Sequence, residues 1–324
     1  MHTKIYKWGI IGCGNVTEVK SGPAYKQTNG FELQAVMRRN GELAKDYAKR
    51  HGVPNYYGNA DTLINDPEID AIYIATPPDT HAEYALKVAK AGKICCIEKP
   101  MAPTFEACKL VSETFQAKEI PLFVAYYRRS LPRFLQVRKW LEEEKIGAIR
   151  HVSWHLSKPA SAIDLSKEYN WRTDAKIAYG GYFDDLASHG IDLICFFLGE
   201  IKQVTGIATN QQNLYNAKDA VVASWIHESG VTGSGSWNFG THKREDRLEI
   251  YGEKGKIICS VFDEVHVQLE NGTERLRLKI ENPNPIQKYH VLNMHKHLIG
   301  IEQHPSTGNS AVHTAWVMDR ILGK

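Results

Sequence analysis

Short apolar runs alternate with helical patterns along the first 125 residues of the chain. The runs cover residues 8–12, 32–37, 71–76, 93–98 and 121–126. Stretches such as GELAKDYAKRHG and THAEYALKVAKAG lie between them, with apolar residues at helical spacing. Alternation of strand and helix predicts a doubly wound parallel sheet, an α/β fold. Ligands of such sheets bind beyond the carboxyl ends of the strands.

The pattern changes after about residue 130. A helix over 132–147 is followed by a strand near 149–157 and a strongly apolar helix over 183–198. Residues 201–280 alternate as in an antiparallel sheet, with Asn271-Gly272 as a hairpin turn. Helices over 286–302 and 309–322 close the chain. We predict two domains, residues 1–125 and 126–324, and the last helix can pack back on the first domain.

Composition favours a protein that acts on small molecules. The chain has 324 residues, 43% of them hydrophobic and 24% charged, and a net charge of +3. No run of one charge indicates nucleic-acid or membrane binding. The absence of a signal peptide pattern and of a long apolar run predicts a cytoplasmic location. The six cysteines lack CxxC or zinc-like spacing, so we expect reduced, packed thiols and no metal site.

A glycine turn follows the first predicted strand, in the stretch GIIGCGNVT. Gly12 and Gly14, followed by Asn15 and Val16, stand where glycines let a backbone approach the pyrophosphate of a dinucleotide. Thr17 replaces the third glycine of the usual motif. A tight turn without a ligand is the alternative interpretation.

Two arginines follow the second predicted strand. NAD-binding units usually carry Asp or Glu there for the ribose 2'-hydroxyl, whereas this chain has Arg38 and Arg39. A guanidinium can bind a 2'-phosphate through two hydrogen bonds. NADP is therefore the preferred cofactor and NAD remains possible, unless both arginines are only solvated loop residues.

Further candidates end the third and fourth predicted strands. Thr76 and Pro77 form a loop that could lie against a nicotinamide, and a structural hydrogen-bonding role is favoured for His81. In ICCIEKP, Pro100 ends the strand, so Lys99 would project its ammonium toward the ligand crevice. Glu98 would point to the other side as a structural partner. A solvated lysine is the alternative.

An apolar helix carries a polar stripe in YGGYFDDLASHGID. Asp185, His189 and Asp192 share one face, and a polar stripe there is costly unless its members are paired or line a wet site. A carboxylate beside a histidine suits a general acid/base. A metal site lacks the usual zinc spacing, and a purely structural histidine remains the other alternative.

Taken together, the glycine turn, AGKICCIEKP, YYRR (126–129), NWRTD (170–174), YGGYFDDLASHGID and IYGEKGKI resemble the Gfo/Idh/MocA oxidoreductases. The resemblance implies an NAD(P)-binding Rossmann domain and a second domain whose open, mostly antiparallel sheet binds substrate and often makes oligomer contacts. It implies hydride exchange with a sugar, cyclitol or related polyol. Lys99 would hydrogen-bond the reacting oxygen, His189 would exchange the proton, and Asp185 would support both.

Departures from the family pattern leave the substrate open. Tyr179 and Ala187 stand where glycines are frequent, and Tyr127 replaces a common asparagine. Tyr127, Arg128, Trp171 and Arg172 are expected to join Asp185 and His189 at the substrate. The expected cofactor residues are Gly12, Gly14, Asn15, Val16, Arg38, Arg39, Thr76, Pro77, His81, Glu98 and Lys99.

The overall expectation is an NADP-preferring dehydrogenase or reductase that forms a homodimer or homotetramer. The alternatives are a glycosidase that acts by transient oxidation with retained cofactor, and a non-catalytic cofactor- or sugar-sensing protein. Other residues could line a sugar pocket or belong to the core: Trp154, His155, Tyr169 and Trp237. The C-terminal histidines are expected at the surface or an interface: His290, His295, His297 and His304.

Overall fold

The computed structural model describes residues 4–263 and 265–324, which form two compact units. The first unit comprises the chain up to Ser130 together with Pro283–Val312. The second comprises Leu131–Asn282 and His313–Lys324. The chain thus returns to the first unit after most of the second is complete.

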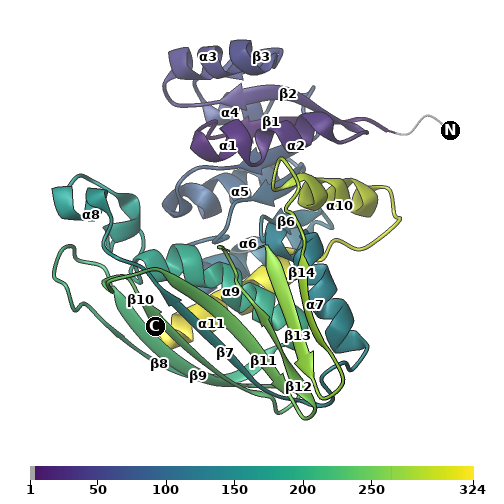
Figure 1. Cartoon of the computed structure of the whole chain (residues 1–324). Coiled ribbons are helices and arrows are strands. Elements are labelled where there is room, and N and C mark those ends of the chain that lie inside the picture. Colours follow the sequence, from purple (N-terminus) through teal and green to yellow (C-terminus); the bar gives the residue numbers. More distant parts are fainter. Residues whose placement is uncertain (1–3, 264) are drawn as a thin grey trace. The chain divides into compact units, whose positions relative to one another are not determined.

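The first unit contains a parallel sheet of six strands in the order β3-β2-β1-β4-β5-β6 (Figure 1). The strands are β1 Tyr6–Ile11, β2 Phe31–Met37, β3 Asn55–Tyr57, β4 Ala71–Ile74, β5 Ile94–Ile97 and β6 Leu122–Val124. This confirms the predicted doubly wound sheet. The edge strand β3 was not predicted, because three residues are too few to show a periodic pattern.

Helices and 3₁₀ turns connect these strands or, in the case of η2 and α10, follow the last of them. They are α1 Asn15–Val19, α2 Gly22–Gln27, α3 Gly41–His51, α4 Ala60–Ile64, η1 Pro78–Thr80, α5 His81–Lys90, α6 Phe105–Ala117, η2 Tyr127–Ser130 and α10 Lys288–Leu298. Three of them, α3, α4 and α6, begin at side-chain caps. Asn40 Oδ1 accepts from Leu43 N at 3.2 Å, Asn59 Oδ1 accepts from Asp61 N at 2.7 Å, and Thr104 Oγ1 accepts from Ala107 N at 3.2 Å. Such caps satisfy backbone donors that a helix start leaves unpaired.

The returning helix α10 buries two histidines that were expected at the surface. Val291 and Met294 of α10 belong to the same buried cluster as Trp8 of β1. His290 and His304 are only 1% and 4% exposed, so the surface prediction is wrong for both. Local sequence could not predict this burial, because the strands of the first sheet precede both histidines by more than 150 residues.

The burial of His304 predicts an acid-sensitive stability. Its Nδ1 accepts from Ser306 N at 3.0 Å, and burial lowers its pKa to about 4. The unfolded chain takes up this proton near pH 6.5, so the free energy of unfolding should fall as pH drops from 6.5 toward 4. Between pH 7 and pH 5 the contribution is roughly 2 kcal/mol.

Urea unfolding of the wild type and of His304→Gln, each at pH 7 and pH 5, measures this contribution. The variant is expected to lose less stability than the wild type over this interval, whatever its stability at pH 7. Equal losses in the two proteins would contradict the prediction.

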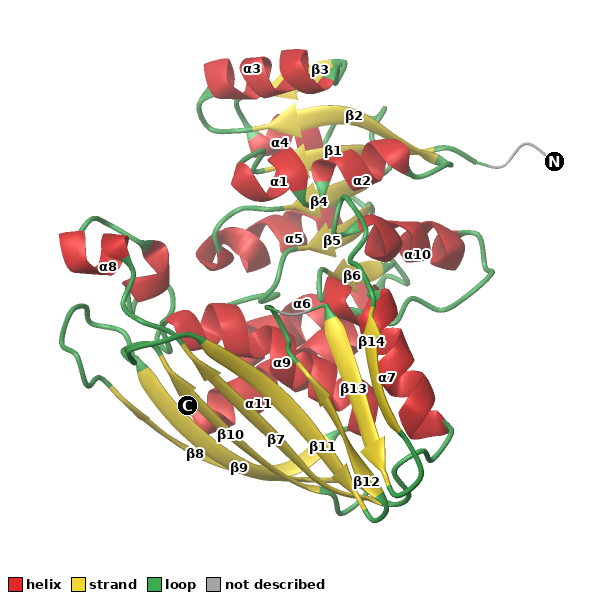
Figure 2. Cartoon of the chain, in the orientation of Figure 1, coloured by secondary structure: helices red, strands yellow, loops and turns green. Residues whose placement is uncertain are grey.

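The second unit contains a sheet of eight strands in the order β14-β13-β12-β11-β7-β10-β9-β8 (Figure 2). The strands are β7 Ile149–Ser157, β8 Ile201–Thr209, β9 Ala220–His227, β10 Thr232–Asn238, β11 Glu245–Gly252, β12 Gly255–Cys259, β13 His266–Asn271 and β14 Arg275–Lys279. Only β7 and β10 pair in parallel, and the other neighbours are antiparallel. The predicted mostly antiparallel sheet is confirmed.

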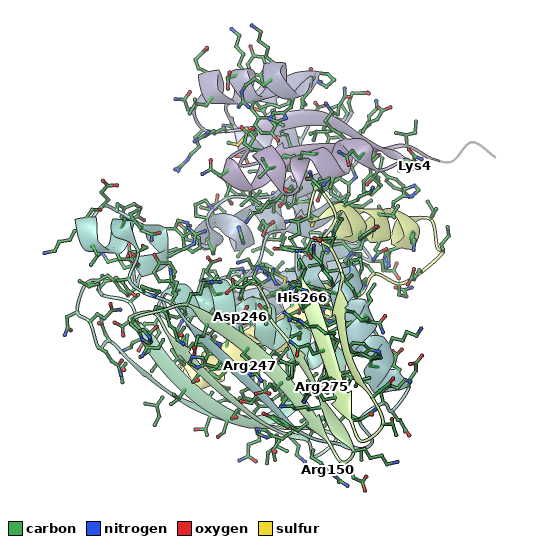
Figure 3. All side chains as sticks on the ribbon, in the orientation of Figure 1. Lys4, Arg150, Asp246, Arg247, His266 and Arg275 are labelled. Carbon is green, nitrogen blue, oxygen red and sulfur yellow. The ribbon has the colours of Figure 1, made fainter. Side chains whose placement is uncertain are left out.

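Three helices cover one face of this sheet: α7 Pro132–Glu142, α9 Tyr182–Leu198 and α11 Gly308–Ile321 (Figures 1 and 2). The short elements α8 Ala162–Ser166 and η3 Trp171–Thr173 precede α9. Among the described residues of the second unit, no helix lies on the opposite face (Figures 1 and 2). Side chains alternate between the faces, so Asp246 of β11 points inward and bonds Trp154 Nε1 at 3.0 Å, while its neighbour Arg247 is exposed (Figure 3).

Close packing of α9 on the sheet decides the role of two tryptophans. Trp154 and Trp237 are 0% and 1% exposed, with ring centroids 5.5 Å apart, so they belong to the core and not to a sugar pocket. A Cβ on Gly190 would lie 2.2 Å from the Trp154 ring. Glycine at this position therefore lets α9 approach the sheet closely, and this approach sets the distance of the neighbouring His189 from the sheet.

The described cysteines form no disulfide, and all but Cys195 are buried, as expected for packing residues. Within residues 4–263 and 265–324, no group of three or more His, Cys, Asp or Glu side chains is placed to hold a metal ion. None of the helices in the same ranges has the length and apolar character needed to cross a bilayer.

Candidate active site

The candidates of the first unit follow five strands of the parallel sheet. Gly12 and Gly14 follow β1, Arg38 and Arg39 follow β2, and Thr76 and Pro77 follow β4. Glu98 and Lys99 follow β5, and Tyr127 and Arg128 follow β6. The carboxyl ends of parallel strands meet at one edge of the sheet, so these residues gather there. The strand order also reverses direction between β1 and β4, where such sheets bind their ligands.

The glycine turn after β1 fits the backbone of a dinucleotide. Gly12 has φ +95°, and a Cβ there would lie 2.8 Å from the Ala75 carbonyl carbon. A Cβ on Gly14 would meet only one backbone oxygen, at 4.0 Å, so the space beside Gly14 is open. Thr17 is buried and its Oγ1 donates to Gly14 O at 2.8 Å, which holds the turn. Asn15 and Val16 begin α1 directly behind this open space.

Gly22 supplies the close packing that the third glycine of the motif usually permits. A Cβ on Gly22 would lie 2.3 Å from Thr17 O and 2.5 Å from the Tyr47 hydroxyl. That hydroxyl donates to Thr17 O at 2.8 Å. The departure at Thr17 therefore leaves the turn intact.

Arg38 and Arg39 are both exposed at the end of β2. Neither side chain makes an ion pair or hydrogen bond with another residue in the described part of the chain. Burial raises the pKa of the Cys13 thiol to about 11, and the positive charge of Arg38 partly offsets this rise. The positive charge of the Arg38 guanidinium therefore reaches the glycine turn, where it can bind an anionic group.

His81 ties together the loops after β4 and β5. It is 1% exposed, its Nδ1 lies 2.8 Å from Pro100 O, and its Nε2 lies 2.8 Å from Thr76 O. Burial is the main cause that lowers its pKa. Both ring nitrogens face backbone carbonyls, so the histidine fixes the loop geometry, as the structural interpretation expects.

Glu98 is a buried anchor at the end of β5. Its Oε1 accepts from the Tyr73 hydroxyl at 2.6 Å and from Gln287 Nε2 at 2.8 Å, and its Oε2 accepts from Lys99 N at 3.2 Å. This arrangement agrees with its expected structural role. It also holds the backbone of Lys99, whose side chain is half-buried at the strand end.

Tyr127 and Arg128 lie in η2 and are 7% and 5% exposed. The Arg128 guanidinium stands 4.9 Å from the centre of the Tyr127 ring. The stacked pair follows β6, so it lies at the same edge of the sheet as the glycine turn.

In the second unit, α9 begins at a constrained glycine. Gly181 has φ +64°, and a Cβ there would lie 2.4 Å from Lys218 O. The helix that follows places Tyr182, Asp185 and His189 at i, i+3 and i+7, on one face. His189 is 5% exposed, and its ring centre lies 5.9 Å from that of Phe262.

Asp185 is engaged by an arginine from η3. Its Oδ2 accepts from Arg172 Nε at 2.6 Å, and the Arg172 guanidinium lies 4.4 Å from the centre of the Trp171 ring. The aspartate side chain is 14% exposed, whereas the arginine side chain is 38% exposed. Three of the predicted substrate residues, Trp171, Arg172 and Asp185, are thus in one connected group.

The other carboxylates of α9 have structural surroundings. Asp192 is 0% exposed and accepts from Thr314 Oγ1 of α11 at 3.2 Å. Asp184 accepts from Gly180 N at 2.8 Å, and burial raises its pKa to about 6. The predicted polar stripe therefore ends at His189, and Asp192 serves to join two helices.

Sequence reasoning missed Lys158, which follows β7 directly. Its Nζ lies 3.3 Å from the centre of the Tyr182 ring, and the Tyr182 hydroxyl donates to Asp164 Oδ1 at 2.7 Å. Ser157-Lys158-Pro159 repeats the signal of Glu98-Lys99-Pro100, a lysine fixed by proline at the end of a strand. The same argument would have found both lysines.

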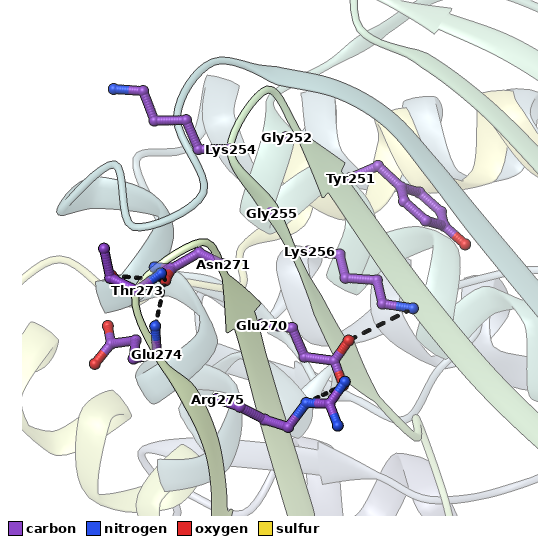
Figure 4. A pocket seen from close by; sticks show the side chains of 10 residues that line it. All are labelled: Tyr251, Gly252, Lys254, Gly255, Lys256, Glu270, Asn271, Thr273, Glu274 and Arg275. Carbon is purple, nitrogen blue, oxygen red and sulfur yellow. Dashed lines mark hydrogen bonds and ion pairs between the residues drawn. The ribbon is translucent and has the colours of Figure 1, made fainter.

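One hollow in the second unit contains none of these residues. It measures about 640 Å³ and is lined by ten residues at the β13–β14 hairpin and the β11–β12 turn (Figure 4). Lys256 and Arg275 both pair with Glu270 there, while Asn271 Oδ1 accepts from the backbone of Thr273 and Glu274. These contacts join neighbouring strands of the sheet, and the pairing of β13 with β14 confirms the predicted hairpin at Asn271-Gly272.

A second hollow of about 420 Å³ adjoins the candidate site. Its lining includes Asp164 and Asn170, and both bond the hydroxyl of Tyr182, at 2.7 and 3.1 Å. Tyr169 also lines it and is 73% exposed. His155 lies elsewhere, on the uncovered face of the sheet, with Nδ1 2.7 Å from Ser236 Oγ.

Comparison with known proteins identifies both parts of the chain. Residues 6–126 match the family described as "Oxidoreductase family, NAD-binding Rossmann fold". Residues 134–258 match the one described as "GFO/IDH/MocA C-terminal domain". The two matches cover the regions that hold most of the candidate residues.

Individual oxidoreductases are also similar to this chain. Oxidoreductase P35 of Formosa agariphila is 36% identical over 317 residues, which is 98% of each chain. Levoglucosan dehydrogenase of Pseudarthrobacter phenanthrenivorans is 32% identical over 232 residues, 72% of this chain and 54% of that protein. A solved levoglucosan dehydrogenase, in complex with NADH and levoglucosan, superposes with a TM-score of 0.87 at 23% identity, covering 98% of this chain and 96% of that one. The chain therefore belongs to the Gfo/Idh/MocA family of oxidoreductases.

Proposed function

We propose that this protein transfers a hydride between NADP(H) and a hydroxyl or carbonyl carbon of a sugar, cyclitol or related polyol. The observation that carries the proposal is the set of Lys99, Asp185 and His189 in a chain of this family. Lys99 stands two residues after β5, at the edge of the Rossmann sheet where ligands bind, and the other two share a face of α9.

Each of these residues has a separate task. The nicotinamide, when bound, supplies or accepts the hydride. The Lys99 ammonium donates a hydrogen bond to the reacting oxygen and stabilises negative charge that develops there. The His189 imidazole takes or gives the proton of that oxygen. Asp185, paired with Arg172, orients the substrate and the histidine.

The preference for NADP rests on Arg38 and Arg39. Both are exposed beside the glycine turn, and the end of β2 has no carboxylate that would bind a ribose 2'-hydroxyl and repel a phosphate. The levoglucosan dehydrogenase structure contains NADH, so the preference is a property proposed for this chain from its own residues.

Replacing both arginines, Arg38→Ala with Arg39→Ala, should remove this preference. Each charge-assisted hydrogen bond to the phosphate is expected to contribute about tenfold to hundredfold in kcat/KM for NADPH. The measurement is the ratio of kcat/KM for NADPH and NADH. Lys45→Ala, an exposed cation on α3, serves as the control. An unchanged ratio in the double variant would rule out a role for the arginines in cofactor choice.

A sugar-like substrate is supported by the aromatic and hydrogen-bonding groups around Asp185 and by the similarity to levoglucosan dehydrogenase. Absorbance of the reduced nicotinamide, followed with a panel of sugars, anhydrosugars, inositols and diketones, tests the function. Steady turnover with one substrate class supports it. Tightly retained cofactor and cleavage without net turnover would favour the glycosidase alternative, and binding without chemistry would favour a sensing protein.

We also propose that the uncovered face of the eight-stranded sheet forms a homodimer or homotetramer. Ile207 and Val222 are 68% and 50% exposed, and they are direct neighbours on β8 and β9. Beside them, Thr205, Ser224 and Ser234 form a row of small hydroxyl side chains across three strands. Small side chains of this kind let two sheets approach closely.

Val222→Arg is expected to shift the protein toward the monomer, because the charge would lie in the contact. Light scattering after size exclusion gives the mass of each protein. Leu165→Arg, at a 62% exposed position on α8, provides the control and should leave the mass unchanged. An assembled Val222→Arg variant would place the interface elsewhere.

A further inference from the structure

Lys158 lies beside the helix face that carries Asp185 and His189. It follows β7 directly, and its Nζ stands 3.3 Å from the centre of the Tyr182 ring. Tyr182 is the first residue of α9 and shares the face of Asp185 and His189. The ammonium is therefore placed over the N-terminal end of the face that the proposed function assigns to the substrate.

The ammonium has no partner of opposite charge in direct contact. Within residues 4–263 and 265–324, no carboxylate lies within 4.0 Å of the Lys158 Nζ, and this nitrogen donates no hydrogen bond to another residue. The side chain is half-buried, and burial is the main cause that lowers its pKa. A partly dehydrated cation of this kind gains most from an anionic hydrogen-bond acceptor.

The nearby carboxylates are already engaged. Asp164 accepts hydrogen bonds from Ser161 N at 2.8 Å, from Ser161 Oγ at 2.6 Å and from the Tyr182 hydroxyl at 2.7 Å. Asp185 is paired with Arg172 at 2.6 Å. Both carboxylates act on the charge of Lys158 from a distance, but neither completes its hydrogen bonding.

The Tyr182 ring gives the lysine a fixed place. Its hydroxyl accepts from Asn170 Nδ2 at 3.1 Å and donates to Asp164 Oδ1 at 2.7 Å. These two hydrogen bonds fix the position of the ring. A cation over an aromatic face is stabilised there, and its outward N–H groups remain available to a ligand. The site is thus built before a substrate arrives.

We propose that Lys158 binds the carboxylate of an acidic sugar, so that the preferred substrates are uronic acids. The inference rests on the proposed function, because that function makes this face of α9 the substrate side. A neutral hydroxyl would leave the charge of the ammonium uncompensated, whereas a carboxylate neutralises it through a charge-assisted hydrogen bond. Lys158 is then the residue that separates acidic from neutral sugars.

Two matched pairs of sugars test this assignment: glucuronate against glucose, and galacturonate against galactose. For the wild type, kcat/KM with NADP⁺ is expected to favour the acidic member by about tenfold to hundredfold. Lys158→Met should abolish this ratio, and Lys158→Arg should keep most of it. Lys202→Met removes an exposed lysine on β8 and should leave the ratio as in the wild type.

A wild type that does not favour the acids, or a Lys158→Met variant that keeps the ratio, would overturn the inference. If no sugar of either pair is oxidised, the proposed function is in question, and calorimetric binding of the same four sugars decides about Lys158. Tighter binding of the acids that is lost in Lys158→Met supports the inference. Equal or absent binding of acids and neutral sugars refutes it.

Discussion

Replacing Lys99 with methionine is expected to lower kcat by about 10²- to 10³-fold, the usual effect of removing a donor to a developing oxyanion. The side chain leaves the end of β5, where Glu98 and the neighbouring loops hold its backbone. Methionine preserves the length of the side chain but cannot donate a hydrogen bond. The cofactor should still bind, because the glycine turn and the arginines of the β2 end are untouched.

The measurement is kcat and KM with the substrate found by the panel, together with the dissociation constant of the cofactor. Lys90→Met changes an exposed lysine at the end of α5 and should behave as the wild type. A Lys99→Met variant with nearly unchanged kcat would remove the lysine from the catalytic set. Lys99→Arg adds a second readout, because a donor of different basicity should alter the pH–rate profile.

His189→Asn is expected to lower kcat by about 10²- to 10⁴-fold, the range typical of a lost general acid/base. Asparagine keeps a polar side chain at this buried position on α9 but cannot exchange a proton near neutral pH. The pH dependence of kcat should also lose the limb that the histidine provides.

Circular dichroism and the thermal midpoint show whether the variant is folded. His242→Asn, at an exposed histidine in the loop before β11, is the matched control. A purely structural histidine would give a destabilised variant whose folded fraction keeps both its kcat and the wild-type pH profile. That outcome would contradict the assignment.

Hydrophobic patterning predicted the main elements of the fold because the strands of the first sheet are buried on both faces and the second sheet alternates. The pattern failed where an element was very short, as in β3, or where burial depended on a distant segment. His290 and His304 illustrate the second case. Their polar side chains suggest a surface, yet α10 packs against strands that precede it by about two hundred residues.

The candidate site was predictable where position along an element decides it. Lys99 stands two residues after the parallel strand β5, and Asp185 and His189 are one helical turn apart, so the local sequence sufficed to propose them. Pairing was not predictable. Asp192 bonds Thr314, which lies 122 residues further on, and nothing in the helix itself separates this aspartate from Asp185.

Deuterium transfer from NADPH that carries two deuterium atoms at C4 tests the central proposal most directly. The protein is incubated with this cofactor and the carbonyl form of its substrate, and the product is analysed by mass spectrometry. Hydride transfer predicts one deuterium on the carbon that bears the new hydroxyl, and no transfer by the Lys99→Met and His189→Asn variants above a small residual rate. A product that forms without deuterium would contradict the proposed function.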